Sequence, residues 1–460
     1  PELDRKRGIE NTSGPLGLGH AFGVGDAIAE RFLVARFGEV IANHTYIYIS
    51  DGGIQEEISQ GVGRLAGFLG LGKVIMFYDS NDVQLSTEVN EVTSEDVAKK
   101  YEAWGWQVLT IDGHDHNAIR SAIQSGKAEG NKPTLIIGKT IIGKGAMQED
   151  GNAYEGEVET HGKPLGQSKA SFAKTVANLG GDANHPFEVF SDVAAYYLQV
   201  INRKKDMAAA RKEEIARWKE ANPAKAAKLN AFLANKLPDI DWSAILQKDT
   251  VATRGASGAV LAHLAEKVEN MIVASADLSV SDKTDAFLNK TTAFSNGDFS
   301  GAFLQAGVSE LTMAALSVGM SLHGGVIPAC ATFFAFSDYM KPVIRVAALM
   351  ELPCIFIWTH DSFRVGEDGP THQPVEQEAQ IRLLERLKNH SGKNSFVALR
   401  PADAHETTHA WKFALENKDT PTGLILSRQD VPTLPSENRF AAAAELSKGA
   451  YVVQDAGDAP

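Results

Sequence analysis

Short apolar runs alternate with helix-like stretches in the first third of the chain, and this alternation restricts the possible folds most strongly. Tyr46 to Ile49, Val74 to Tyr78 and Leu135 to Ile137 have the length and composition of buried strands. Between the first two runs, apolar residues recur at helical spacing over residues 54–69. Strand, helix and strand in this order predict a parallel sheet with helices on both faces.

The same pattern returns after a polar interval. The stretch from about Phe187 to Leu237 is rich in Lys, Ala and Glu, which is typical of a solvated helical connector. Five more strand-like runs follow it, at Met271 to Ala274, Val326 to Thr332, Cys354 to Trp358, Phe396 to Leu399 and Gly423 to Leu426. We therefore predict an α/β protein with two doubly wound parallel-sheet domains joined by a helical linker.

Composition argues against several classes of function. The 460 residues carry 45 Lys and Arg against 58 Asp and Glu, and a net charge of −13 disfavours binding to nucleic acid. Only Cys330 and Cys354 are present, so a disulfide framework or cysteine zinc site is unsupported, and a cytoplasmic location is the default. The uncharged stretch from Leu311 to Ser337 contains Gly, Pro and His, so we expect a buried helix and strand and no membrane partner.

Polar residues follow the predicted strands of the first domain, where ligands bind in open parallel sheets. Asp51 follows the first strand, Asn81 the second, and His161 lies in the loop after the third. Asp51 and Asn81 offer oxygen ligands of the kind that Mg²⁺ takes beside phosphates, and Gly52 lets backbone N–H groups approach an anion. This pattern predicts a diphosphate bound through magnesium. Alternatively, Asp51 is a helix N-cap and Asn81 a turn residue.

Basic and imidazole side chains stand near strand ends in the second domain. His360 ends one strand, Arg428 ends the next, and Arg254 lies earlier in the chain. Such residues can form a cradle for a sugar phosphate, because charge-assisted hydrogen bonds contribute about 1.5–3 kcal/mol each. Taken singly, Arg254 and Arg428 are more typical of surface ion pairs, and His372 of a loop-stabilising hydrogen bond.

A glycine-rich run, Gly14 to Gly25, precedes what we predict to be an amphipathic helix. Together with the motifs above, it resembles the transketolase family, which uses thiamine diphosphate. Asp51-Gly52 followed by Asn81 is similar to the thiamine-diphosphate signature, and the polar loop Gly366 to Pro374 is the most specific match. The other matching segments, in order along the chain, are Gly14 to Gly17, Lys139 to Gly143, His161-Gly162, Ser275 to Leu278, Thr359 to Ser362 and Leu426 to Gln429.

The resemblance implies the thiamine-diphosphate-binding fold and a division of the chain. Residues 1–186 would form a diphosphate-binding domain without its amino-terminal part, 187–248 the linker, 249–440 a pyrimidine-binding domain, and 441–460 the start of a carboxy-terminal domain. It also implies a homodimer with its site at the subunit interface. The family's amino-terminal histidines have no counterpart before Pro1, so a chain that starts there is expected to be a poor catalyst.

The resemblance also implies the residues that bind the cofactor and its metal. Asp51, Asn81 and the backbone carbonyl of Val83 would hold Mg²⁺, with Ca²⁺ as a substitute. The residues that would contact thiamine diphosphate are Gly14, Pro15, Leu16, Gly52, Asn81, His161, Asp277, Phe333, Phe336 and Tyr339. Of these, Phe336 would come from the partner subunit and stack on the pyrimidine ring.

Catalytic roles follow from the same resemblance. Glu310 would hydrogen-bond the pyrimidine nitrogen, or else act as a helix N-terminal carboxylate. Asp368 and His372 would be the other catalytic groups and would also contact the sugar hydroxyls. Sugar-phosphate substrates would be held by Arg254, Ser281, His360, Asp368, His372 and Arg428.

The implied activity is that of a transferase of the pentose phosphate pathway. A two-carbon ketol unit would pass from a ketose phosphate to an aldose phosphate through an enamine on the cofactor. The alternatives are an inert dimer partner that binds the cofactor, and another thiamine-diphosphate synthase. Two departures stand out: Ser50 replaces the usual glycine, and Arg386 to Asn394 looks like an inserted surface loop.

Overall fold

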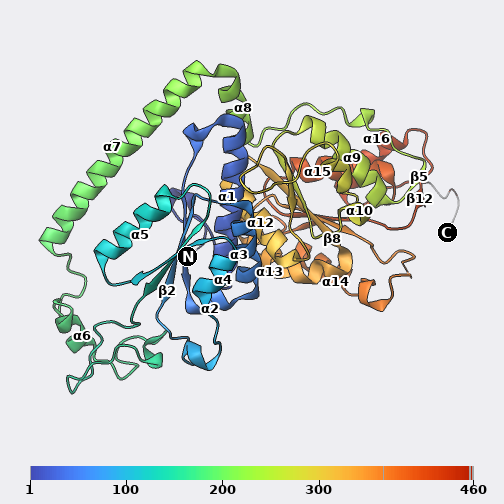
Figure 1. Ribbon diagram of the computed structural model, residues 1–460. Coiled ribbons are helices and arrows are strands. Elements are labelled where there is room, and N and C mark those ends of the chain that lie inside the picture. The colour runs from blue at the N-terminus through green and yellow to red at the C-terminus, as the bar shows by residue number, and fades with distance from the viewer. Residues whose placement is uncertain (1, 366, 455–456, 458–460) are drawn as a thin grey trace. The chain divides into compact units, whose positions relative to one another are not determined.

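The computed structural model describes residues 2–365, 367–454 and 457 (Figure 1). The chain forms two compact units. One unit contains the residues up to Gly38 and from Ala227 onward, and the other contains residues 39–226. Over the described ranges, no helix combines the length and the apolar character needed to cross a membrane.

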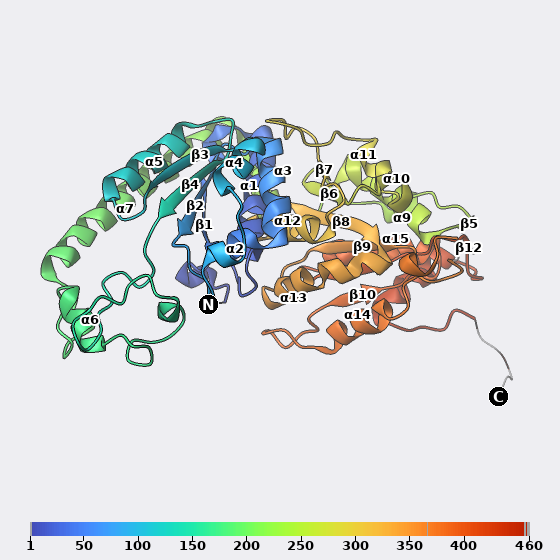
Figure 2. The same ribbon diagram turned by 60° about the horizontal axis from the view of Figure 1, so that its bottom comes forward.

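The unit of residues 39–226 is built on a parallel sheet with the strand order β1-β2-β4-β3. Its strands are β1 (Thr45–Ser50), β2 (Val74–Ser80), β3 (Gln107–Asp112) and β4 (Thr134–Lys139). The helices between them are α2 (Asp51–Gln55), α3 (Glu57–Leu69), α4 (Val97–Ala103) and α5 (His116–Ala128). Helix α5 covers one face of the sheet, where Ile75, Ala122 and Ile136 form a buried cluster (Figure 2).

The three strands predicted for this half are confirmed as β1, β2 and β4, whereas β3 was not predicted from the sequence. Its residues, Gln107 to Asp112, include polar side chains at both ends, and all six are only half-buried or exposed. Such a strand lacks the continuous apolar run by which its neighbours are recognised. Its place at the sheet's edge explains this composition, because an edge strand packs against fewer neighbours.

The predicted helical connector is confirmed by two helices, α7 (Ser191–Ala221) and α8 (Pro223–Leu233), which follow the short helix α6 (Phe172–Asn178). Helix α7 is the long green helix of Figure 1, and none of its residues is buried. Its solvent exposure agrees with the Lys- and Glu-rich sequence, because charged side chains keep such a helix soluble without a core contact.

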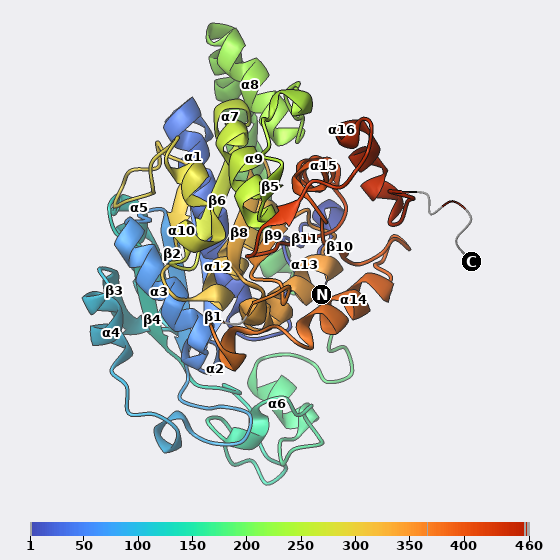
Figure 3. The ribbon, with the colours of Figure 1, turned by 90° about the vertical axis from the view of Figure 1, so that its right-hand side faces the viewer.

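The other unit contains a six-stranded parallel sheet of order β10-β11-β9-β8-β6-β7 (Figure 3). Its strands are β6 (Met271–Ser275), β7 (Phe303–Gln305), β8 (Ile327–Phe333), β9 (Ile355–Thr359), β10 (Val397–Leu399) and β11 (Thr422–Ile425). An antiparallel pair, β5 (Thr250–Val251) and β12 (Val431–Pro432), lies outside this sheet. All five strands predicted for this half are confirmed, and only the three-residue β7 of the main sheet was not predicted.

Besides most of α8, nine helices of the described residues belong to this unit. They are α1 (Leu18–Phe37), α9 (Thr253–Lys267), α10 (Ser279–Asp282), α11 (Asp285–Leu288), α12 (Glu310–His323), α13 (Lys341–Leu349), α14 (Gln377–Arg386), α15 (Ala404–Glu416) and α16 (Arg439–Ala443). Helix α12 and strand β8 are almost fully buried, which confirms the prediction for the uncharged stretch from Leu311 to Ser337. Helix α14 ends at Arg386, and residues 387–394 form a mostly exposed loop after it, as expected.

Helix α1 differs from the amphipathic helix that the sequence predicted. It begins at Leu18, within the glycine-rich run, and is buried on nearly all sides against α12 and its neighbours. A Cβ atom on Gly25 would lie 2.3 Å from the carbonyl oxygen of Leu316, and one on Gly319 would lie 2.3 Å from that of Phe22. The glycines therefore allow two helix backbones to touch, which explains a glycine-rich helix without a polar face.

The two sheets share one topology. In each, a long helix precedes four parallel strands whose order in space is first, second, fourth and third: α1 before β1, and α12 before β8. In the six-stranded sheet, β6 and β7 continue beyond β8, whereas among the described strands β1 pairs only with β2. Tyr46 and Tyr48 of β1 are accordingly 56% and 69% exposed, although parallel sheets are normally covered on both faces.

Candidate active site

The first group of predicted site residues lies at the carboxyl ends of β1 and β2, in the unit of residues 39–226. Ser50 ends β1, and its Oγ accepts a hydrogen bond from the backbone N–H of Gly53 at 3.4 Å. Ser50 is therefore the N-cap of α2, and the alternative that Asp51 caps this helix is wrong. Asp51 is instead the first residue of α2, and Ser50 has a defined structural role at the start of this helix.

The carboxylate of Asp51 is held in a fixed orientation. It is 1% exposed and accepts hydrogen bonds from the Tyr78 hydroxyl at 2.6 Å and from the backbone N–H groups of Asn81 and Asp82 at 3.0 and 3.2 Å. Burial raises the pKa of Asp51, while the hydrogen bonds from Tyr78 and Asn81 act in the opposite direction. Because desolvation disfavours the ionised form of a buried carboxylate, a cation that binds beside it is stabilised by the charge it compensates.

Asn81 stands one residue beyond β2, and its Oδ1 accepts a hydrogen bond from the N–H of Val83 at 3.2 Å. The prediction of a turn residue is thus confirmed. Ser50 and Asp79 are paired in the parallel register, so the residues after both strands meet at one edge of the sheet. Within the described residues there is no cluster of three or more His, Cys, Asp or Glu side chains suited to a metal. The predicted metal ligands include a single carboxylate, that of Asp51, and their other oxygen donors are an amide and a backbone carbonyl.

A cavity of about 550 Å³ lies beside these residues, in the same unit. It is lined by Gln55 of α2, by Tyr78, Ser80 and Asp82 at the end of β2, by Lys139 of β4, and by residues 93–98 before and within α4. The Gln55 Nε2 is buried and has no hydrogen-bond partner in the part of the chain that the structure describes. Neither Asp51 nor Asn81 is among the lining residues, so the cavity is adjacent to the predicted diphosphate site and not identical with it.

Three other predicted groups are not brought together by hydrogen bonds. His161 is exposed in the loop after β4, where its backbone N–H donates to the carbonyl of Val158 at 3.0 Å. Gly14, Pro15 and Leu16 are exposed residues before α1 and belong to the other compact unit. Gly52 lies in the first turn of α2, next to Asp51.

The second group of predicted residues gathers at the carboxyl ends of β6, β9 and β11. The Arg254 Nη1 donates to the backbone carbonyl of Ser281 at 2.7 Å and lies 3.4 Å from the His360 Nε2. Its contacts are thus a carbonyl and an imidazole, which differs from the surface ion pair that a lone arginine suggests. Burial and the nearby charge of Arg428 lower the pKa of Arg254. Two guanidinium groups that repel each other in a partly desolvated place favour the binding of an anion.

Arg428 pairs with two acidic residues of the polar loop. It contacts the carboxylate of Glu367, and its Nε lies 3.6 Å from the Asp368 Oδ2. The expectation of an ion pair for Arg428 is therefore confirmed. The same Asp368 oxygen lies 4.0 Å from the His360 Nε2 and is buried without a hydrogen bond from any described residue, so it can accept one from a ligand hydroxyl. Gly366, the first residue of this motif, lies outside the described residues.

Aromatic and imidazole rings line the same place. The ring centroids of Phe333 and His360 are 3.7 Å apart, and those of Phe336 and His372 are 5.3 Å apart. The ring centroids of Phe336 and Tyr339 are 6.4 Å apart. Burial, followed by the charges of Arg254 and Arg428, lowers the pKa of His360 to about 3, so its imidazole is neutral near pH 7. The His372 Nδ1 and the Thr371 hydroxyl form a hydrogen bond of 2.9 Å, as expected for a histidine that stabilises a loop.

Glu310 begins α12, which confirms the expectation of a carboxylate at a helix N-terminus. Its Oε1 accepts a hydrogen bond from the Thr332 hydroxyl at 3.3 Å, so it also touches the strand that ends at Phe333. Asp277, in contrast, is exposed and has a positive φ of 62°. Thr332 was not predicted, because a threonine within an apolar strand carries no distinctive sequence signal.

Comparison with known families agrees with both halves of this description. The profile described as "Transketolase, thiamine diphosphate binding domain" matches residues 1–238, and that described as "Transketolase, pyrimidine binding domain" matches residues 249–433. The fold and the matched domains define a thiamine-diphosphate-binding protein with two parallel-sheet α/β domains.

Curated relatives and solved structures then specify the family. Transketolase from Geobacillus stearothermophilus is 41% identical over 99% of this chain and 67% of its own length, and that from Bacillus subtilis is 39% identical over 98% and 66%. The structure of transketolase from Leishmania mexicana is similar with a TM-score of 0.89 and 35% identity, over 100% of this chain and 66% of that one. The chain belongs to the transketolase family, whose members are transferases, and spans about two thirds of the length of these relatives.

Proposed function

We propose that the protein transfers a two-carbon ketol unit between sugar phosphates, using thiamine diphosphate and a divalent metal. The observation that carries this proposal is the continuous set of contacts from Ser281 through Arg254 and His360 to Asp368 and Arg428. We call Arg254, Ser281, His360 and Arg428 the phosphate cradle. Two guanidinium groups and one N–H of a neutral imidazole can donate hydrogen bonds to a phosphate, while the Asp368 Oδ2, which is paired with Arg428 by charge, can accept a hydrogen bond from a sugar hydroxyl.

The residues at the ends of β1 and β2 fit the cofactor's diphosphate and its metal. Asp51, Asn81 and the carbonyl of Val83 would hold Mg²⁺, with Ca²⁺ as a possible substitute, because these are hard oxygen donors on two adjacent strand ends. Gly52 and His161 would contact the diphosphate. When bound, the cofactor supplies the carbon nucleophile that accepts and releases the two-carbon unit.

The second unit supplies the remaining proposed contacts. Glu310 would share a proton with the pyrimidine ring, while Gly14, Pro15, Leu16, Asp277, Phe333, Phe336 and Tyr339 would surround that ring. His372 and Asp368 would hold the sugar hydroxyls. We propose a homodimer in which each subunit completes the site of the other, and a cytoplasmic location, in keeping with two free, buried cysteines.

A coupled assay tests the proposal. The protein is incubated with thiamine diphosphate, Mg²⁺, xylulose 5-phosphate and ribose 5-phosphate, and release of glyceraldehyde 3-phosphate is followed. A transketolase from Pichia stipitis has a structure in complex with xylulose 5-phosphate, which supports this choice of donor. Turnover that depends on both cofactor and metal is expected. Hydrogen–deuterium exchange at the thiamine C2 without any turnover would instead indicate an inert partner, and turnover of pyruvate alone another class of synthase.

A further inference from the structure

Beneath the phosphate cradle lies a buried carboxylate that has no role in the proposed chemistry. Asp282 is the last residue of the four-residue helix α10 and is 0% exposed. It directly follows Ser281, whose carbonyl accepts the hydrogen bond from Arg254. Asp282 was not selected from the sequence, because Ser279 to Asp285 is a short, mostly polar stretch like many surface turns.

Every oxygen of this carboxylate has a buried partner. The Oδ2 accepts a hydrogen bond from the Ser275 hydroxyl, at the end of β6, at 2.7 Å. The Oδ1 accepts hydrogen bonds from the backbone N–H and the hydroxyl of Thr284 at 2.9 and 2.7 Å. Asp282 thus connects the central sheet to the segment that follows α10.

These bonds close a ring around the turn that carries Ser281. The Ser275 Oγ also accepts a hydrogen bond from the N–H of Leu278 at 3.1 Å, and the carbonyl of Leu278 accepts from the N–H groups of Ser281 and Asp282, both at 2.8 Å. A helix of four residues has almost no stability of its own. Its position therefore depends on this ring, in which Asp282 is the side chain that joins both ends.

We propose that Asp282 is a positioning residue for the phosphate cradle: it holds Ser281 in place, Ser281 orients Arg254, and the affinity for phosphorylated sugars depends on it. This inference rests on the proposed function. Asp282 does not touch the substrate in this arrangement, so its loss should weaken phosphate binding more than it slows the reaction. Burial raises the pKa of Asp282 to about 6, which agrees with a carboxylate retained at an energetic cost.

Binding of ribose 5-phosphate to the full chain, measured by calorimetry, tests the inference without requiring turnover. Asp282→Ala is expected to raise the dissociation constant about tenfold, the effect of one weakened hydrogen bond to a charged group. Asp282→Asn retains an oxygen for Thr284 and is expected to stay within about twofold of wild type. Asp285→Asn removes the same charge three residues away and serves as the matched control.

Steady-state kinetics gives the second measurement, because a merely structural defect would lower kcat as well. For Asp282→Ala we expect KM for xylulose 5-phosphate to rise about tenfold with kcat nearly unchanged. If Asp282→Ala does not fold, Ser275→Ala removes the two hydrogen bonds of the Ser275 Oγ but leaves those between Asp282 and Thr284, and should raise the dissociation constant by a smaller factor, about threefold.

The outcomes separate the two proposals. Unchanged affinity for ribose 5-phosphate in folded Asp282→Ala or in Ser275→Ala overturns the inference, as does equal weakening by Asp285→Asn. Affinity that depends on Asp282, in a protein without turnover, supports the inference and refutes the proposed function. A wild-type protein that binds no ribose 5-phosphate overturns both.

Discussion

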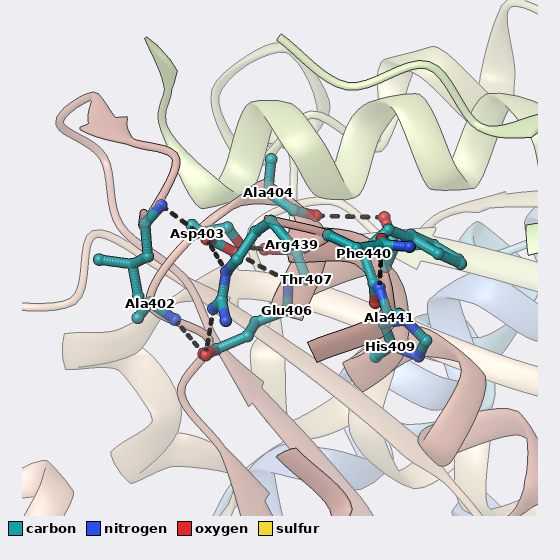
Figure 4. Close-up of polar contacts among 12 residues, drawn as sticks. Ala402, Asp403, Ala404, Glu406, Thr407, His409, Arg439, Phe440 and Ala441 are labelled. Atoms are coloured by element: carbon teal, nitrogen blue, oxygen red, sulfur yellow. Dashed lines mark hydrogen bonds and ion pairs between the residues drawn. The ribbon is translucent and has the colours of Figure 1, made fainter. Parts of the chain in front are cut away.

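Arg439 and Asp403 form a buried ion pair in which the arginine Nε lies 2.6 Å from the carboxylate Oδ2 (Figure 4). The Arg439 Nη2 lies 2.5 Å from the Glu406 Oε1, and its Nη1 donates to the Tyr451 hydroxyl at 2.6 Å. Asp403 also caps α15 by accepting the N–H of Glu406 at 2.9 Å. Ion pairs and hydrogen bonds between Arg439 and the two carboxylates therefore hold the segment after β12 against α15.

Replacing Arg439 by Ala should strongly destabilise this unit. The substitution leaves Asp403 and Glu406 buried without their cation, and removal of one partner from such a pair typically costs about 3–5 kcal/mol. Urea unfolding followed by circular dichroism would measure the loss. Lys448→Ala, which breaks an exposed pair with Glu445, is the control and should change the free energy of unfolding by about 1 kcal/mol or less. A loss for Arg439→Ala no larger than that of the control would contradict the expectation.

The buried Asp282 predicts a particular dependence of stability on pH. Burial raises its pKa from 3.8 to about 6, so the folded state binds a proton more tightly than the unfolded state. The favourable contribution of this proton is complete below about pH 3.8 and is lost as the pH rises through about 6. Relative to wild type, Asp282→Asn should therefore gain up to about 3 kcal/mol between pH 4 and pH 7, which corresponds to the pKa difference. Unfolding curves of both proteins at several pH values test this; a constant difference across the range would refute it.

Much of the fold could be predicted because the central strands are continuous apolar runs. β2 and β9 are recognisable from Val74 to Tyr78 and Cys354 to Trp358, since both faces of a parallel sheet are covered. The edge strand β1 is recognisable from Tyr46 to Ile49 because its exposed positions are tyrosines, which are also apolar in character. β3 and β7 were not predicted, the first because it is polar at its ends and the second because it has only three residues. The contact between α1 and α12 could not be read either, because glycines that allow two helices to touch look like loop residues in a sequence.

In the candidate site, too, some residues could be predicted from the sequence and others could not. Arg254 and Arg428 were selected as single basic residues near predicted strands, but only the fold brings them to one place from positions 174 apart in the chain. Ser50 as a helix cap and Asp282 as a buried anchor were not foreseen. Both have short polar side chains, and their roles depend on which backbone and side-chain groups the fold places beside them. The local sequence does not specify these groups.

Arg254 provides the most direct test of substrate class. Its guanidinium is the part of the phosphate cradle that contacts both Ser281 and His360. Loss of one charge-assisted hydrogen bond of about 1.5–3 kcal/mol predicts that Arg254→Ala lowers kcat/KM for xylulose 5-phosphate by about 10- to 150-fold. Xylulose, which lacks the phosphate, should be affected little. Equal loss for both sugars would show that Arg254 does not contact the phosphate.

Asp51 should govern binding of the cofactor through its metal. In Asp51→Ala the proposed site keeps only neutral oxygen donors, and affinity for a divalent cation falls steeply when its carboxylate is lost. We expect at least a tenfold rise in the dissociation constant of thiamine diphosphate, equivalent to about 1.4 kcal/mol, measured by calorimetry with Mg²⁺ in excess. The Tyr78 hydroxyl and the N–H groups of Asn81 and Asp82 also lose their acceptor, so folding must be verified by circular dichroism at the same temperature. Ser50→Ala is the matched control: it weakens the cap of the same helix but removes no proposed ligand, so cofactor affinity should change by less than about threefold. If both variants lose affinity equally, the effect comes from the helix start and not from a metal held by Asp51.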